Sequence, residues 1–230
     1  MAWGFGRLAT LHLSLVNVKV LQTQPKLVEQ VHGAILAEIA SGHLAPGARI
    51  IQEQLAKELG VSRQPVQQAL LLLRNQGVLH DAPGRGLLVA PLDLDFVKKM
   101  YDIRAVIEGL AFQQAAFINP ERAKRDGPGY LKRGRQAVAS GSVRDLIAAD
   151  MAFHDFIYEL SENPLIAPAM DTHWIQAQRV MGEVLMRDDQ PRNIWDQHEV
   201  LLEHIVNGDG SAAEQLAREH ILQAAAFMIN

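Results

Sequence analysis

Acidic and imidazole side chains in the second half of the chain have the types and the spacing of metal ligands. Asp150 and His154 stand four residues apart in a segment of helical periodicity, so both project from one face of a helix and can share an ion. His198 and His220 lie on two further predicted helices. Three neutral imidazoles and a carboxylate suit zinc, nickel, manganese or iron. Because Asp-x-x-x-His also occurs often by chance, spacing alone leaves unrelated core and surface residues as the alternative.

The other histidines lack a partner at such spacing. His204 follows His198 by six residues, and about 240° of net helical rotation points it away from the same site. For His173 we expect a polar core or surface position; the alternative is a position at the border of the pocket around the predicted metal ligands. The remaining ones are expected to be structural or exposed: His12, His32, His43 and His80.

Composition limits both the fold and the chemistry. The 230 residues are 48% hydrophobic and 21% charged, which is typical of a globular protein and excludes intrinsic disorder. This length favours two domains over one. There is no cysteine, so disulfides, thiolate metal sites and cysteine nucleophiles are excluded, and any metal must use His, Asp or Glu.

The N-terminal segment is apolar but does not resemble a membrane helix. Polar residues interrupt the stretch from Leu8 to Val20, and no run reaches the roughly 18 apolar residues that a membrane span needs. We therefore expect a cytoplasmic protein with no membrane partner, in which residues 1–24 form an N-terminal arm.

The second half of the chain is predicted to be an all-α bundle of six helices. Pairs of breaking and capping residues separate the helices, among them Asn119-Pro120 and Asn163-Pro164. Pro128, within Asp-Gly-Pro-Gly, is expected to end or kink the second helix. The predicted helices span residues 93–118, 121–140, 143–161, 164–187, 191–207 and 210–228.

The first half has a different charge and a different pattern. Residues 1–90 hold eight Lys or Arg against five Asp or Glu, whereas the remainder holds 14 against 21. A helix is predicted over 26–41, a second from Gln52 to Gly60, and a third after Ser62, which can act as its N-cap. A short glycine-containing turn between two helices is the layout of a helix-turn-helix.

A β-hairpin follows the third predicted helix. The β-prone runs at 78–80 and 87–89 bracket a turn with Gly84 and Gly86 at its tip, which leaves Arg85 exposed. A helix-turn-helix followed by such a hairpin is a winged helix.

The run from Leu44 to Pro91, "LAPGARIIQEQLAKELGVSRQPVQQALLLLRNQGVLHDAPGRGLLVAP", resembles the winged-helix domain of GntR-family transcription regulators. The resemblance lies in the Pro-Gly turn, the Gly-Val-Ser-Arg turn, Pro-Val and the Gly-Arg-Gly wing. It implies that double-stranded operator DNA is the partner and that the DNA contacts are Arg49, Ser62, Arg63, Gln64, Gln67, Gly84, Arg85 and Gly86.

One position departs from the family pattern. Arg-Glu commonly follows Pro-Val in the family, whereas this chain has Gln67-Gln68. Arginine grips guanine or phosphate through two charge-assisted bonds, whereas glutamine prefers adenine and adds no charge. We therefore expect the operator sequence to differ from those read by family members with Arg-Glu at these two positions.

The C-terminal half resembles the FCD domain of the FadR-type branch, in its VanR-like six-helix form. "YDIRAVIEGLAF" resembles the opening helix, and "DMAFHDFIYELSENP" matches the Asp-x-x-x-His helix. The resemblance implies a divalent transition metal (zinc, nickel or manganese) on Asp150, His154, His198 and His220, and a small carboxylate effector paired with Arg104.

The expected protein is mainly α, with a winged helix-turn-helix at 25–91 and an all-α effector-binding and dimerisation domain at 92–230. Its expected function is that of a homodimeric repressor whose operator affinity is modulated by the effector, and not that of an enzyme. One alternative is a metal-dependent enzyme acting on a small organic acid, because an open His/Asp site can activate water. Another is an architectural DNA binder without an effector.

Overall fold

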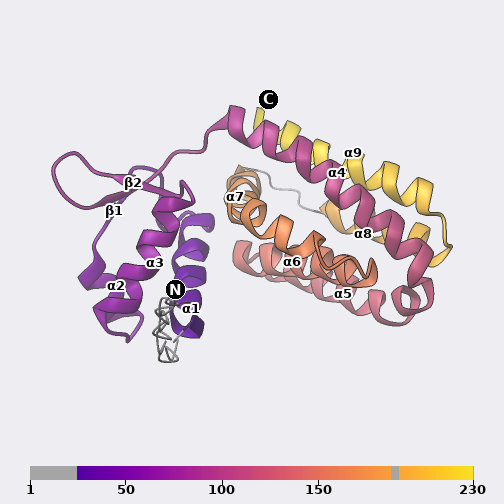
Figure 1. The fold of residues 1–230 in the computed structure, drawn as a ribbon, viewed down its shortest axis with the longest axis horizontal. Helices are drawn as coiled ribbons and strands as arrows, with labels where there is room; N and C mark the ends of the chain where they lie inside the picture. The colour runs from indigo at the N-terminus through magenta and orange to yellow at the C-terminus, as the bar shows by residue number, and fades with distance from the viewer. Residues whose placement is uncertain (1–24, 188–191, 230) are drawn as a thin grey trace, which may run out of the picture.

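A computed structural model describes residues 25–187 and 192–229, so the expected arm at 1–24 lies outside the described residues. In this part of the chain, helices dominate and two groups of elements are joined by one extended segment (Figure 1). The first group is α1 (Pro25–Ala40), β1 (Arg49–Ile50), α2 (Gln52–Glu58), α3 (Arg63–Asn75), β2 (Leu79–Asp81) and β3 (Leu87–Val89). The second is α4 (Leu94–Ile118), α5 (Pro120–Ser140), α6 (Val143–Leu160), α7 (Ile166–Arg187), α8 (Arg192–Val206) and α9 (Gly210–Ile229).

The first group has its own hydrophobic core. The apolar faces of α1 and α3 pack together, with Ile35, Val66 and Leu73 buried between them. Gly60 ends the segment after α2 with a φ of 64°, a left-handed conformation that glycine adopts without strain. The predicted helix-turn-helix is therefore confirmed.

The predicted hairpin is also confirmed, and it gains a third strand. The antiparallel sheet has the order β1-β3-β2, with Arg49 opposite Leu88 and Leu79 opposite Val89. The sequence did not predict β1, because two residues are too short to show an alternating pattern.

The second group is the predicted six-helix bundle. In Figure 1, α9 lies along α4, and α5, α6, α7 and α8 complete the bundle. Side chains cap two of the helices: Asp93 accepts hydrogen bonds from the first turn of α4, and Ser142 accepts one from Asp145 N in α6. No helix in the described ranges is long and apolar enough to cross a membrane.

Of the two outcomes expected at Pro128, an end of the helix is wrong, since α5 runs through it from Pro120 to Ser140 and so spans the predicted 121–140. Pro128 is exposed, so its ring faces solvent, and the helix loses a single backbone hydrogen bond there. Packing on both sides of the proline compensates for that loss. Gly127 and Gly134 lie directly against Leu202 and Trp195 of α8, where an added Cβ would overlap those side chains.

The two groups touch through α7. Ile175 packs against the core of the first group. Gln176 Nε2 donates to the carbonyl of Gln76 at the C-terminal end of α3 (2.9 Å), and Arg179 donates to the carbonyl of Ala90 in the connecting segment. One bundle helix, α7, thus contacts both the C-terminal end of α3 and the segment that connects the two groups.

Candidate functional site

Three imidazoles converge deep inside the bundle. His154 comes from α6, His198 from α8 and His220 from α9, and all three are buried with ligand nitrogens within 4.8 Å of one another. The Nε2 atoms of His198 and His220 are 3.2 Å apart. A divalent transition metal is commonly held by imidazole nitrogens in this kind of arrangement.

Asp150 lies at the edge of the imidazole cluster. It stands one helical turn before His154, with Oδ2 at 4.0 Å from His154 Nε2 and Oδ1 at 3.5 Å from His198 Nε2. The structure therefore brings together all four side chains that were expected to bind metal. Burial raises the pKa of Asp150, although His154 and Arg104 nearby oppose that rise.

The imidazoles of His198 and His220 are neutral. Burial, with the nearby positive charge of His154, lowers the pKa of His220 to about 3. Burial and the neighbouring His220 and His154 lower the pKa of His198 well below its ordinary value. Neutral imidazoles have the lone pairs that a metal requires.

The hydrogen bonding of the rings also fits a metal. His220 Nδ1 lies 2.7 Å from Gln197 Oε1, which can only accept, so the ring proton sits on Nδ1 and Nε2 keeps its lone pair. That lone pair points toward the Nε2 atom of His198. His198 Nδ1 is buried without a hydrogen-bond partner. The donor set, its burial and its tautomers thus suit a bound cation.

Glu108 of α4 is a site residue that the sequence reasoning missed. Its carboxylate has no solvent exposure, and Oε2 lies 2.5 Å from His154 Nδ1. Burial alone would raise the pKa of Glu108, but Arg104 and His154 beside it lower the pKa to about 2. Glu108 in turn raises the pKa of His154 against the effect of burial. The available signal was its position four residues after Arg104, on the same helix face.

Arg104, the expected effector contact, is buried beside the cluster and already has a partner. Its Nε and Nη2 atoms donate to Glu108 Oε1 at 2.9 and 2.8 Å. The rings of Tyr101 and Trp174 lie 4.7 and 4.6 Å from the guanidinium carbon. The indole Nε1 of Trp174 is buried and makes no hydrogen bond. The residue that covers the guanidinium therefore keeps one unpaired donor.

The other histidines of the described residues lie outside the imidazole cluster. His204 lies on α8, 3.7 Å from Asp209, which agrees with the helical rotation expected for it. His173 is half-buried on α7, where burial lowers its pKa.

The expected DNA-contacting residues line an exposed edge of the first group. Arg49 Nη2 donates to the carbonyl of Arg85 at 2.8 Å, which joins β1 to the tip of the wing. Gln52 Nε2 donates to the carbonyl of Arg63 at 2.9 Å and so joins the starts of α2 and α3. Arg63 pairs with Glu53, and both side chains are more than two-thirds exposed, so water weakens that ion pair.

The remaining candidates for DNA contact are also exposed. Ser62 is the N-cap of α3, although its side chain makes no capping hydrogen bond and remains available. Gly84 and Gly86 have φ values of 90° and 98°, which form the tight tip of the wing. Gln64 and Gln67 project from the first turns of α3.

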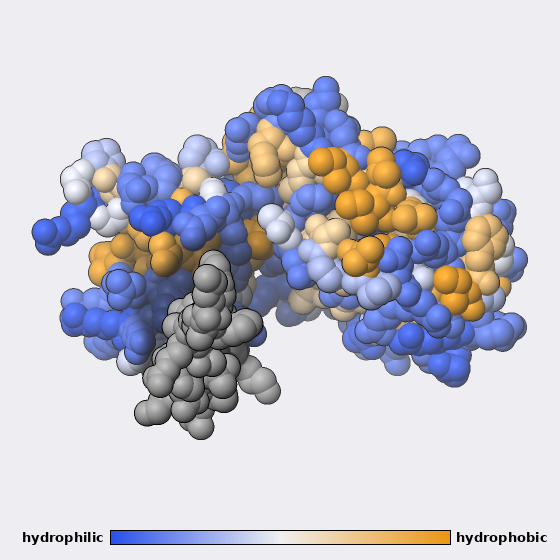
Figure 2. Space-filling model, viewed as in Figure 1, coloured by the Kyte–Doolittle hydropathy of each residue, from blue (hydrophilic) through white to orange (hydrophobic). Residues whose placement is uncertain are grey.

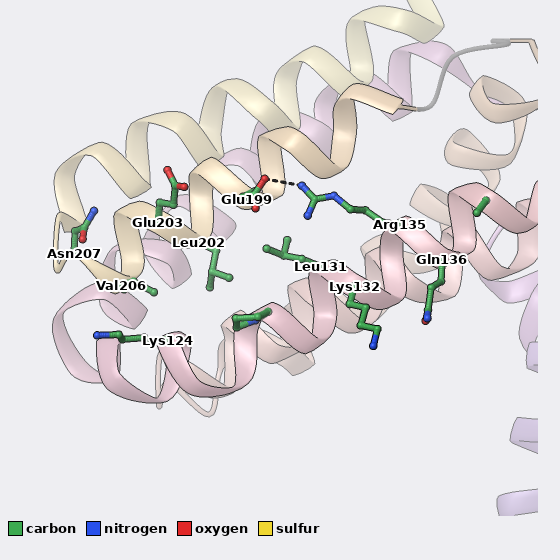
Figure 3. A pocket seen from close by; sticks show the side chains of 12 residues that line it. Lys124, Leu131, Lys132, Arg135, Gln136, Glu199, Leu202, Glu203, Val206 and Asn207 are labelled. Atoms are coloured by element: carbon green, nitrogen blue, oxygen red, sulfur yellow. Dashed lines mark hydrogen bonds and ion pairs between the residues drawn. The ribbon is translucent and has the colours of Figure 1, made fainter.

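One hollow of the bundle is lined by none of the imidazoles. It is a groove of about 620 Å³ between α5 and α8 (Figure 3). Leu131 and Leu202 line it, Lys132 and Arg135 lie on the α5 side, and Glu199 lies on the α8 side. Arg135 crosses to Glu199, with Nη2 and Oε2 2.6 Å apart. The cavity beside Asp150 is only about 20 Å³.

Two domain families match the chain. The bacterial regulatory proteins of the gntR family match residues 27–89, and the FCD domain matches residues 99–223, which is more than half of the chain. The chain belongs to the GntR family. It is a DNA-binding transcription regulator with an FCD domain, in agreement with the expected winged helix and helical bundle.

Known GntR proteins resemble this regulator over most of its length. The probable D-xylose utilization operon transcriptional repressor of Paenarthrobacter nicotinovorans is 26% identical over 200 residues, covering 86% of this chain and 87% of that protein. The transcriptional repressor RspR of Escherichia coli is 23% identical over 90% of each chain. The solved structure of E. coli McbR/YncC has a TM-score of 0.75 and 25% identity, covering 88% of this chain and 97% of that one.

Proposed function

We propose that this GntR regulator is a cytoplasmic repressor whose operator affinity is modulated by a small carboxylate bound beside a divalent metal in the FCD domain. The observation that carries the proposal is the convergence of three buried imidazoles with Asp150, directly beside the Glu108–Arg104 pair. The similarity to two proteins named as repressors supports the direction of control.

His154, His198, His220 and Asp150 would hold the metal, with zinc, nickel and manganese as the candidate ions. The metal would supply a positive charge for an anionic ligand. Arg104 would supply the second positive charge, since a carboxylate entering a mostly apolar bundle needs its charge compensated. The effector would share the guanidinium with Glu108.

Helix α7 offers a route from the effector site to the DNA-binding domain. Trp174 places its ring over Arg104, with its centroid 5.5 Å from that of His154. The next residues, Ile175 and Gln176, contact the first group of elements. A ligand that moves Trp174 therefore acts on the helix that holds the end of α3, which is the differential contact that coupling between two sites requires.

We further propose that the regulator is a homodimer formed through the exposed face of α4. Figure 2 shows apolar side chains gathered over this helix. Exposed hydrophobic residues recur there every seven positions, with Val106 beside them, which is the repeat of paired helices. A second copy presents the same stripe, so a two-fold pairing is self-complementary and matches a two-fold operator. The stripe consists of Phe96, Ile103, Leu110 and Phe117.

The dimer is tested by Ile103→Glu, which places a charge in the centre of the stripe. Sedimentation of the wild type should give a dimer, and the variant should shift toward monomer. Leu165→Glu is the matched control, because Leu165 is more exposed than Ile103 but lies in the turn before α7. A dimer that survives Ile103→Glu, or that Leu165→Glu dissociates equally, contradicts the assignment.

The regulatory function is tested by operator affinity. Operators are selected from random duplexes, and affinity is then titrated with a panel of small organic acids for zinc-loaded and metal-free protein. An effector should change the affinity by about 5- to 150-fold. Arg104→Lys keeps the charge opposite Glu108 but loses the two-pronged geometry, so it should weaken effector binding more than it weakens zinc binding.

The same titration separates the alternatives. No response to any acid supports the architectural DNA binder. Turnover of an acid by the zinc-loaded protein, lost in His198→Ala, supports the metal-dependent enzyme.

A further inference from the structure

The imidazole cluster is supported from outside by two side chains that do not point at its centre. Glu108 lies on α4, a helix that supplies none of the three imidazoles, and its Oε2 faces His154 Nδ1 at 2.5 Å. Gln197 lies on α8, directly before His198, and its Oε1 faces the Nδ1 atom of His220 on α9 at 2.7 Å. In both cases the contact is made to the ring nitrogen remote from the cluster.

These contacts determine which ring atom faces inward. An imidazole has two nitrogens, and an acceptor at Nδ1 keeps the proton there and leaves Nε2 with its lone pair. The His154 Nε2 atom lies on the side of Asp150, at 4.0 Å, and the His220 Nε2 atom lies 3.2 Å from His198 Nε2. Gln197 thus fixes the flip and the tautomer of His220 in the form that coordinates a cation. The Glu108 carboxylate contacts His154 Nδ1 as an ion pair, without the geometry of a hydrogen bond, and so holds that ring with Nε2 on the side of Asp150.

Glu108 is itself held in place. Arg104 binds its other oxygen, Oε1, through two nitrogens, so Oε2 cannot rotate away from His154 without breaking those bonds. Buried carboxylates are seldom retained without such a partner, and here both carboxylate oxygens are engaged. Gln197 is held more loosely, since its amide nitrogen reaches only Gln223 Oε1 at 3.4 Å.

We propose that Glu108 and Gln197 are positioning residues of the metal site, which raise its metal affinity by holding His154 and His220 with Nε2 directed into the cluster. This inference rests on the proposed metal site and adds two residues to it, neither of which is a ligand. Outer partners of this kind are worth about 10- to 100-fold in metal affinity.

The test measures zinc affinity of the full-length protein by competition with a chromophoric chelator, alongside the thermal midpoint of the metal-free protein. Glu108→Met and Gln197→Met keep the side-chain length but remove the acceptor, and each should weaken zinc about 10- to 100-fold. Glu108→Gln keeps an acceptor oxygen and should bind zinc more tightly than Glu108→Met. This partial rescue is a readout that loss of packing alone would not give.

Glu214→Met is the matched control. Glu214 forms an Arg–Glu pair of the same i,i+4 spacing with Arg218 in the same bundle, at 2.7 Å, but this pair is partly exposed and makes no recorded contact with an imidazole. It should lower the thermal midpoint and leave zinc affinity unchanged.

The outcomes distinguish this inference from the proposed function. A wild type that binds no zinc, nickel or manganese removes the metal site itself. A wild type that binds zinc, with Glu108→Met and Gln197→Met within twofold of it, overturns the positioning roles alone. Equal weakening by Glu108→Met and Glu214→Met also overturns the role of Glu108, because the effect would then follow bundle stability. If Glu108→Met does not fold, Gln197→Met and Glu108→Gln decide the outcome.

Discussion

Buried histidines make the stability of the metal-free protein sensitive to acid. His198 and His220 have folded pKa values below the 6.5 of an ordinary histidine, so the unfolded chain binds protons that the folded chain does not. Their contribution is complete above pH 6.5 and is lost as the pH falls toward 3. We expect the free energy of unfolding to decrease by up to about 1.4 kcal/mol per pH unit for each histidine.

Urea unfolding of metal-free protein between pH 7.5 and 5 measures this slope. His220→Gln removes one titrating ring and should flatten it. Zinc competes with the same protons, so its stabilising effect should shrink as the pH falls. A slope that His220→Gln leaves unchanged contradicts the assignment.

The exposed arginines should carry the affinity for DNA. Arg63→Ala should cost about 1–3 kcal/mol of operator binding if Arg63 reads a base, and Arg85→Ala should lower the salt dependence by about one ion if Arg85 holds a phosphate. Lys57→Ala is the control, because Lys57 lies in the last turn of α2. Gel-shift titrations at several salt concentrations measure both effects. Unchanged affinity in Arg49→Ala, Arg63→Ala and Arg85→Ala would remove all three from the interface.

Sequence reasoning found the three imidazoles of the cluster and Asp150 but not the residues behind them. Asp150 and His154 were visible because helical periodicity fixes their common face. Glu108 was not visible in the sequence, because its contact with His154 depends on how closely α4 approaches α6. The partner of Arg104 was missed although its signal is local: an i,i+4 pair within α4 binds the guanidinium that was expected to await a ligand.

At the scale of elements, two glycines of α5 should respond in opposite ways to an added Cβ. Gly134 lies against the indole of Trp195, and the Cβ of Gly134→Ala would overlap it, which should cost about 1–3 kcal/mol of stability. Gly129 is exposed, with the nearest atom 3.8 Å from an added Cβ. Gly129→Ala should therefore stabilise the helix by about 0.5–1 kcal/mol. Chemical denaturation of the two variants checks both signs. Destabilisation by both would mean that α5 tolerates no added side chain.

The helices could be predicted because breakers and caps mark their ends. Asn119-Pro120 and Ser142 stand where the sequence placed them. The error at Pro128 has a physical cause: local propensity predicts a break, whereas the contacts of α5 with α6 and α8 are long-range and override it. The strand β1 was missed because two residues carry too little pattern.

At the scale of the whole molecule, the contact between α1 and α7 should control how the two domains sit together. An added Cβ on Gly182 would overlap the carbonyl of Ala40, so Gly182→Ala should force the last turn of α1 away from α7. We expect faster amide hydrogen exchange at that turn and unchanged zinc affinity. Gly33→Ala is the control, because Gly33 lies in the same α1 with nothing near its Cβ position. Unchanged exchange in Gly182→Ala would show that the contact is dispensable.

This domain contact was beyond sequence reasoning. Charge and periodicity separated a basic winged helix from an acidic bundle, but nothing in the pattern indicated that Gln176 reaches the carbonyl of Gln76. This hydrogen bond forms only in one relative orientation of the two domains, and the shapes of their facing surfaces set that orientation.

The hydrogen bonds between α7 and the DNA-binding domain limit how the regulator can be engineered as a biosensor. A chimaera cut in the linker near Pro91 would exchange α7 but leave behind the α3 end and the Ala90 carbonyl that Gln176 and Arg179 hold. The graft would then lack the hydrogen bonds by which α7 contacts the DNA-binding domain, and with them the proposed route of the effector signal. A transplant that carries both sides of this contact, or redesigns the surface around Gln76, is the one that should keep its output.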